Sequence, residues 1–110
     1  MALQSTASVP TGNASRYLQQ LCTHWSHNLA VAFTPEKGTV TFPRDIRGAD
    51  WPGDGHLVLA ACGNHLDCTI DASRPEQLDQ LKGVVASHLD RFAFKEAPFA
   101  FDWRDGADTA

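Results

Sequence analysis

Two segments of the chain carry apolar residues three and four positions apart, which is the spacing of an amphipathic helix. In residues 14–29 the apolar positions are Tyr17, Leu18, Leu21, Cys22, Trp25 and Leu29. In residues 75–92 they are Leu78, Leu81, Val85, Leu89 and Phe92. Each pattern marks one side of a helix, so both helices are predicted to pack on a core. Asn13 is expected to cap the first helix, and the sequence Ser-Arg-Pro-Glu at residues 73–76 predicts a capping box for the second.

A β-hairpin is predicted where the period changes from helical spacing to alternation. Residues 56–62 and 65–71 flank a Gly-Asn pair at positions 63–64, which is typical of a two-residue hairpin turn. This turn sets Cys62 opposite His65 on the outward face of the hairpin. The alternate residues then form an apolar inner face of Leu57, Leu59, Ala61, Leu66, Cys68 and Ile70.

Three more strands are predicted from shorter runs. Residues 3–9 alternate weakly and favour a first strand. Residues 30–34 and 39–42 are β-branched and aromatic, and they favour a hairpin closed by a four-residue turn at 35–38.

The elements therefore follow the order β-α-β-β-β-β-α. Residues 43–55, rich in Pro, Gly and Asp, are expected to form a long loop. A further short strand is expected at residues 99–103, and residues 104–110 are expected to form a loose polar tail. The predicted architecture is a single two-layer α+β domain over residues 1–103, with an antiparallel sheet covered on one face by two helices. This strand order resembles that of the TATA-binding protein, as a likeness of fold alone.

Charge and cysteine usage narrow the partners and the compartment. Thirteen acidic residues against nine basic ones give a net charge of −4, and the basic residues are scattered. Nucleic acid and anionic membrane are therefore not expected as partners. The N-terminus has neither the basic nor the apolar segment of a signal peptide. Three cysteines without CxxC spacing suit a reducing compartment, so we expect a cytoplasmic protein.

Histidines on both helices are the candidates for a site. His24 and His27 are three residues apart and lie on neighbouring turns. Helical geometry puts His24 at the flank of the apolar stripe and His27 nearer to solvent. His88 falls about 50° from the centre of its own stripe and should be partly buried. If the two helices lie side by side on the sheet, His24 and His88 face each other across the groove between them.

These residues support two hypotheses about what binds there. Imidazole is a common ligand of transition metals, so the predicted metal ligands are His24, His27 and His88. Arg16 and Arg91 add positive charge from the two helices. The predicted ligand-binding set is therefore Arg16, His24, His88 and Arg91. A simpler interpretation stays open, in which the histidines and arginines are ordinary surface or boundary residues with weak ion pairs.

Three functions follow, in descending order of support. The first is a non-enzymatic accessory module that binds a small ligand or a transition metal. The second is an interaction module or homodimer that uses the open sheet face, where His65, Asp67 and Thr69 form a polar stripe. The third is an enzyme with His88 as general acid or base, since imidazole titrates near neutrality. No nucleophile–base pair can be placed, so no catalytic residue is assigned.

Two segments also resemble a bacterial family. They are Arg-Tyr-Leu-Gln-Gln-Leu-Cys-Thr-His-Trp-Ser-His at residues 16–27 and His-Leu-Asp-Arg-Phe-Ala-Phe-Lys-Glu at residues 88–96. With these, the chain resembles the family called domain of unknown function 2218 over nearly its whole length. The family has no established activity, so the resemblance implies no catalytic residues. Some members are joined to siderophore-interacting proteins, which implies a link with iron handling.

Overall fold

The computed structural model describes residues 3–45, 48–93, 101 and 103–107 of the chain. The end of the second family motif, residues 94–96, lies outside the described residues. The elements are β1 (Leu3–Pro10), α1 (Ala14–Trp25), β2 (Ala30–Phe33), β3 (Lys37–Phe42), β4 (Gly55–Cys62), β5 (His65–Ala72), α2 (Pro75–Phe92) and β6 (Arg104–Ala107). The predicted order of elements is confirmed.

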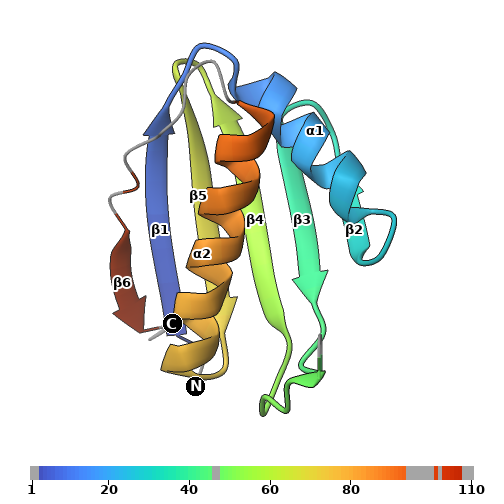
Figure 1. The fold of residues 1–110 in the computed structure, drawn as a ribbon. Coiled ribbons are helices and arrows are strands. Elements are labelled where there is room, and N and C mark those ends of the chain that lie inside the picture. Colours follow the sequence, from blue (N-terminus) through green and yellow to red (C-terminus); the bar gives the residue numbers. More distant parts are fainter. Residues whose placement is uncertain (1–2, 46–47, 94–100, 102, 108–110) are drawn as a thin grey trace.

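The strands form one antiparallel sheet in the order β2-β3-β4-β5-β1-β6. Both helices lie on the same face of this sheet, and no helix of the described residues lies on the other face (Figure 1). β1 sits between β5 and β6 although it comes first in the chain. The predicted two-layer α+β class is therefore confirmed.

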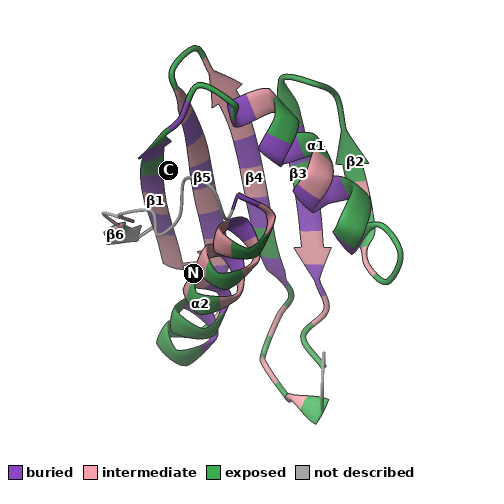
Figure 2. Ribbon diagram, turned by 45° about the horizontal axis from the view of Figure 1, so that its top comes forward, coloured by how far each residue is buried: buried purple, intermediate pink, exposed green. Residues whose placement is uncertain are grey.

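The β4–β5 hairpin has the predicted register. Cys62 pairs with His65, Ala60 with Asp67 and Val58 with Thr69. Buried and partly buried residues alternate along β5, and the first six residues of β4 alternate between buried and partly buried or exposed (Figure 2). The residues with no exposed surface all face the helices, and they are Leu57, Leu59, Leu66, Cys68 and Ile70. Alternation of period two was thus a sufficient guide to which side of these strands forms the core.

The turn of the β2–β3 hairpin is shorter than predicted. Residues 34–36 form it, and Lys37 and Gly38 already pair with Ala60 and Leu59 of β4. Gly38 is buried beneath α1, where a β-carbon would lie 2.5 Å from the Sγ of Cys22. The sequence pattern placed this glycine in the turn. In the structure it lies in β3, where the lack of a side chain lets α1 approach the sheet.

Both helices differ from prediction at an end. α1 stops at Trp25 instead of residue 29, because the backbone N–H groups of Asn28 and Leu29 both bond to the Trp25 carbonyl in a closing turn. Asn13 is at the N-cap position, but its side chain makes no capping bond. Neither α1 nor α2, the helices of the described residues, is long and apolar enough to cross a membrane.

The predicted capping box at residues 73–76 is wrong in detail. Arg74 is the N-cap residue of α2 and makes no side-chain capping bond. Instead the Ser73 backbone N–H donates to Oε1 of Gln77 at 2.7 Å, so a glutamine one position later replaces the expected Glu76. The Gln77 Nε2 group donates in turn to the Gly53 carbonyl at 3.0 Å. This bond fixes the loop before β4 against the start of α2.

The C-terminal part of the chain also departs from prediction. Of the strand expected at residues 99–103, the described residues Phe101 and Trp103 are not in a strand. β6 comes later, in the segment that was expected to be loose, and it pairs with β1. Lys82 of α2 bonds to the Asp105 carboxylate at 2.6 Å. Partners in the sheet and on α2 thus order a polar segment that has no apolar pattern of its own.

Candidate functional site: a cavity between the two helices

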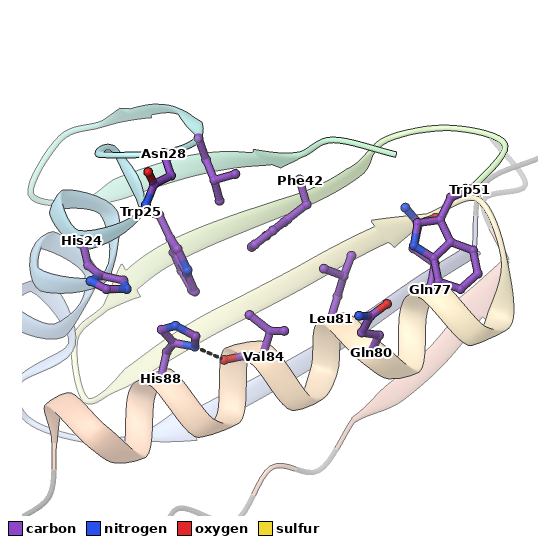
Figure 3. A pocket seen from close by; sticks show the side chains of 11 residues that line it. His24, Trp25, Asn28, Phe42, Trp51, Gln77, Gln80, Leu81, Val84 and His88 are labelled. Carbon is purple, nitrogen blue, oxygen red and sulfur yellow. Dashed lines mark hydrogen bonds between the residues drawn. The ribbon is translucent and has the colours of Figure 1, made fainter. Parts of the chain in front are cut away.

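The two helices diverge over the sheet and leave a cavity between them. α1 packs mainly on β2, β3 and β4, whereas α2 packs mainly on β5 and β1. The cavity has a volume of about 290 Å³ and is lined from both helices, from β3 and from the loop that precedes β4 (Figure 3). Its size and position follow from the angle between the helices, which the sequence pattern does not specify.

Aromatic and aliphatic side chains form the walls of the cavity. Trp25 and Phe42 are almost fully buried and meet edge to face, with ring centroids 5.6 Å apart. Leu81 and Val84 line the α2 side, and Trp51 closes the end formed by the loop (Figure 3). Such walls are typical of sites that bind small molecules.

A pair of histidines from different helices lies at the opposite end. The rings of His24 and His88 have centroids 5.3 Å apart, and His88 is also 5.3 Å from the indole of Trp25. The ring of Phe92 also contacts His24, edge to face, with centroids 5.4 Å apart. The helices therefore do place these two imidazoles at a shared seam, one largely exposed and the other half-buried.

The hydrogen bond of His88 determines its tautomer. Its Nδ1 lies 2.7 Å from the Val84 carbonyl oxygen, and a carbonyl can only accept, so Nδ1 carries the proton. In the neutral ring Nε2 is then left as an acceptor, and in the protonated ring it becomes a donor. A half-buried ring fixed in this way can orient a bound polar group.

The charge around His24 is positive. Burial against its neighbours lowers the pKa of His24 below 6.5, and the positive charges of His88, Arg91 and His27 lower that pKa further. Arg91 is exposed, one turn beyond His88 on α2. The lining residues of the cavity include no Asp or Glu among the described residues.

The other predicted site residues lie further away. His27 is exposed and lines a shallow hollow together with His24 and Phe92. Arg16 is exposed on α1 and lines neither this hollow nor the cavity among the described residues. Within the described part of the chain, the three histidines do not form a group of three donors close enough to share one ion. A metal at His24, His27 and His88 stays a prediction.

Sequence reasoning missed two walls of the cavity. Trp51 was assigned to a featureless loop, and Phe42 was seen only as a strand residue. The available signal was the tryptophan itself, because so large an apolar side chain rarely stands free in a polar loop.

The fold defines a class: a two-layer α+β protein with an antiparallel sheet and two helices on one face. The chain belongs to the family described as an uncharacterized protein conserved in bacteria (DUF2218), whose model matches residues 6–104. This confirms the resemblance seen in the two motifs.

A solved structure has the same fold. It is the NMR structure of PA4090 from Pseudomonas aeruginosa, which is 31% identical, with a TM-score of 0.72 over 93% of this chain and 95% of that one. No curated protein matches the chain. Neither the description of the family nor that of the solved structure mentions iron. The link with iron handling therefore remains only an implication of the resemblance.

Proposed function

We propose that the protein is a non-enzymatic binding module, and that the cavity between α1 and α2 takes a small aromatic molecule carrying one anionic group. One observation carries this proposal: an aromatic-walled cavity of about 290 Å³ ends at paired imidazoles from two helices. The apolar body of the ligand would lie against Trp25, Phe42 and Trp51. Its anionic group would lie at His24 and His88.

The size of the cavity limits the ligand. Pockets for drug-sized ligands measure roughly 300–1,000 Å³, so this cavity is at the small end of that range. A molecule of one or two fused rings matches this volume. Planar rings also suit walls that are themselves aromatic, because offset and edge-to-face contacts add to the gain from burial.

The local charge favours an anion. The chain as a whole is acidic, yet the cavity is lined by two histidines and no carboxylate among the described residues, with Arg91 acting on His24. An anion would favour the protonated imidazoles, so its affinity should rise as pH falls through the titration of His24. Because the pKa of His24 is lowered in the free protein, that rise should continue below pH 6.5.

The lining favours binding over catalysis. The described lining residues offer no hydroxyl, thiol or carboxylate to act with His88. General acid–base chemistry by His88 would therefore depend on groups that the ligand brings. The homodimer through the open sheet face remains a prediction, which light scattering at high concentration would test.

A pair of matched probes tests the proposal. We would titrate 1-naphthoate and the uncharged 1-naphthylmethanol into the protein and follow tryptophan fluorescence. The double variant His24→Gln/His88→Gln should weaken the affinity for naphthoate about tenfold or more, because a hydrogen bond to a charged group is worth about 1.5–3 kcal/mol. The affinity for the alcohol should not change.

Two further variants complete the test. Trp51→Ala should weaken both probes, because both would use the aromatic wall. His56→Gln, on the uncovered sheet face, should weaken neither. Absence of binding by both probes would contradict the proposal. So would a loss of naphthoate affinity in His56→Gln equal to that in the double variant.

A further inference from the structure

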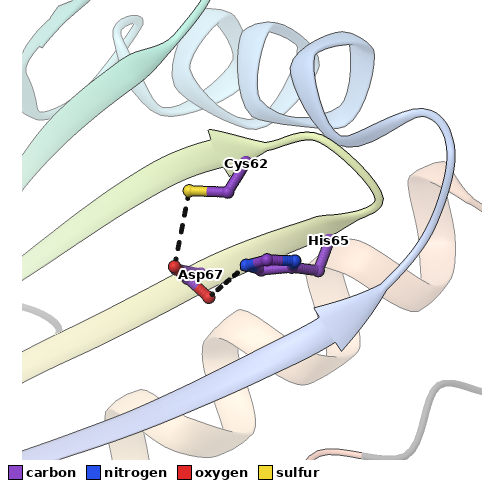
Figure 4. Close-up of side chains that lie close together, drawn as sticks. All are labelled: Cys62, His65 and Asp67. Carbon is purple, nitrogen blue, oxygen red and sulfur yellow. Dashed lines mark hydrogen bonds and ion pairs between the residues drawn. The ribbon is translucent and has the colours of Figure 1, made fainter.

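Three donor side chains meet on the sheet face that carries no helix. Cys62 ends β4 and His65 begins β5, and the two residues are direct cross-strand partners. Asp67 lies two residues beyond His65, so its side chain points to the same face. Figure 4 shows the three side chains converging beside the hairpin turn. All three are half-buried, and they are far from the cavity because the sheet separates them from the helices.

Two of the distances between donor atoms, each to a different oxygen of Asp67, are close to the edges of a tetrahedral zinc site. The Sγ of Cys62 lies 3.5 Å from Oδ2 of Asp67, and Nε2 of His65 lies 3.4 Å from Oδ1 of the same carboxylate. Zinc bonds of ~2.3 Å to sulfur and ~2.0–2.2 Å to nitrogen or oxygen give tetrahedral edges of about 3.4–3.6 Å. One atom from each residue lies within 4.8 Å of the other two. Small rotations of the side chains would therefore close the triangle.

The order of contacts excludes the arrangement of a cysteine nucleophile. In such a site the imidazole contacts the thiol and removes its proton. Here the carboxylate lies between the two, and Cys62 contacts Asp67. Burial, and then the hydrogen bond and charge of Asp67, raise the pKa of the Cys62 thiol. Without a metal this thiol is therefore less reactive than a free one.

We propose that Cys62, His65 and Asp67 bind Zn²⁺, with a fourth position left for water or an external ligand. The ion would replace the thiol proton that now lies between sulfur and carboxylate, and that proton is released to solvent. His65 would bind through Nε2 in its neutral form, with the ring proton on Nδ1. A thiolate and a carboxylate together neutralise the two charges of zinc, and neutral imidazole completes the donor set.

Cobalt gives a direct optical test. Tag-free protein titrated with Co²⁺ should develop a near-ultraviolet thiolate-to-cobalt absorption band that saturates at one equivalent, and Zn²⁺ should abolish it. Cys62→Ala should remove the band altogether. The other two cysteines, Cys22 and Cys68, are buried on the core side and cannot replace it.

The same hairpin offers a matched control. His56 also stands opposite a carboxylate, Asp71, but no cysteine joins that pair. His65→Gln and Asp67→Asn should each weaken the affinity for Co²⁺ about tenfold or more, which is a typical loss when a metal site is impaired. His56→Gln should leave the affinity unchanged.

Several results would overturn the proposal. These are absence of the band at one equivalent, a band that persists in Cys62→Ala, or an equal loss of affinity in His56→Gln. If Cys62→Ala does not fold, alkylation of the unaltered protein decides instead. One equivalent of Zn²⁺ should then slow the reaction of Cys62 with iodoacetamide at least tenfold, and an unchanged rate would contradict the site. The cavity proposal does not depend on either outcome.

Discussion

The two faces of the β4–β5 hairpin differ in burial and in chemistry. On the helix side, alternate residues are leucine, isoleucine and cysteine with no exposed surface. On the other side, the residues between them include Cys62, His65 and Asp67, half-buried and in contact with one another. Because side chains in a strand alternate with a period of two, the same backbone provides core packing on one side and candidate chemistry on the other.

Two cysteines show what each face does to the same functional group. Burial raises the pKa of Cys68 to about 12, and the nearby Asp67 adds to it. The pKa of Cys62 is also raised, first by burial and then by the hydrogen bond to Asp67 and its negative charge. The first thiol is a packing group, whereas the second stands beside His65 and Asp67, the other two residues of the proposed zinc site. Position in the pleat, and not residue type, separates these roles.

The largest contrast should be in stability. Leu59→Ala removes a fully buried side chain from the inner face, so we expect a loss of about 2–5 kcal/mol in the free energy of unfolding. Thr69→Ala on the other face should change it by no more than about 0.5 kcal/mol. Urea denaturation of both variants measures the difference. Equal losses would mean that the two faces are not distinct.

Two glycines, Gly55 in β4 and Gly83 in α2, allow a test of how tightly the inner face is packed. A β-carbon at Gly55 would overlap the Cδ1 atom of Leu81, so Gly55→Ala should cost about 1–3 kcal/mol through overpacking. Gly83 is a matched control on the exposed side of α2, where an added β-carbon meets nothing within 4 Å. Gly83→Ala should instead stabilise the protein by about 0.5–1 kcal/mol, through helix propensity. The same denaturation experiment distinguishes the two signs.

Thiol reactivity should separate the three cysteines. Iodoacetamide should modify Cys62 in the native protein, while Cys22 and Cys68 should react only after unfolding. Asp67→Asn removes the negative charge that raises the pKa of Cys62, so more thiolate forms at neutral pH and the reaction should be a few-fold faster. Mass spectrometry of quenched samples measures each rate. A slower reaction in Asp67→Asn would contradict the assigned cause.

The smallest effect concerns His24. Its pKa is lowered by burial and then by its positive neighbours, so the folded state favours the neutral ring. The resulting stability is present above pH 6.5 and is lost as pH falls through the folded pKa. His88→Gln removes one positive neighbour and should move the pKa of His24 back toward 6.5. An NMR titration follows this pKa directly. A further decrease in the pKa of His24 would contradict the assigned effect of His88.

The parts of the fold that obey a simple period were predictable. The α2 bounds, the β4–β5 register and the seam between His24 and His88 all follow from spacings of 3.6 or two residues. β6 was not predictable in the same way, because Arg104 and Asp105 are ordered by β1 and Lys82, which are distant in sequence.

The candidate sites show the same division. The cavity depends on the angle between the helices and on the loop that places Trp51, neither of which has a sequence pattern. For the metal site, the predicted register already put Cys62 opposite His65. The convergence on Asp67 required side-chain positions that no period supplies.

A ¹H–¹⁵N NMR titration with 1-naphthoate tests the central claim most directly, because the chain has three tryptophans and two of them line the cavity. A ligand held between the helices should shift the indole N–H signals of Trp25 and Trp51. It should leave that of Trp103, which stacks on Phe101 elsewhere, in place. Shifts confined to Trp103, or no shift in any of the three, would contradict binding in this cavity.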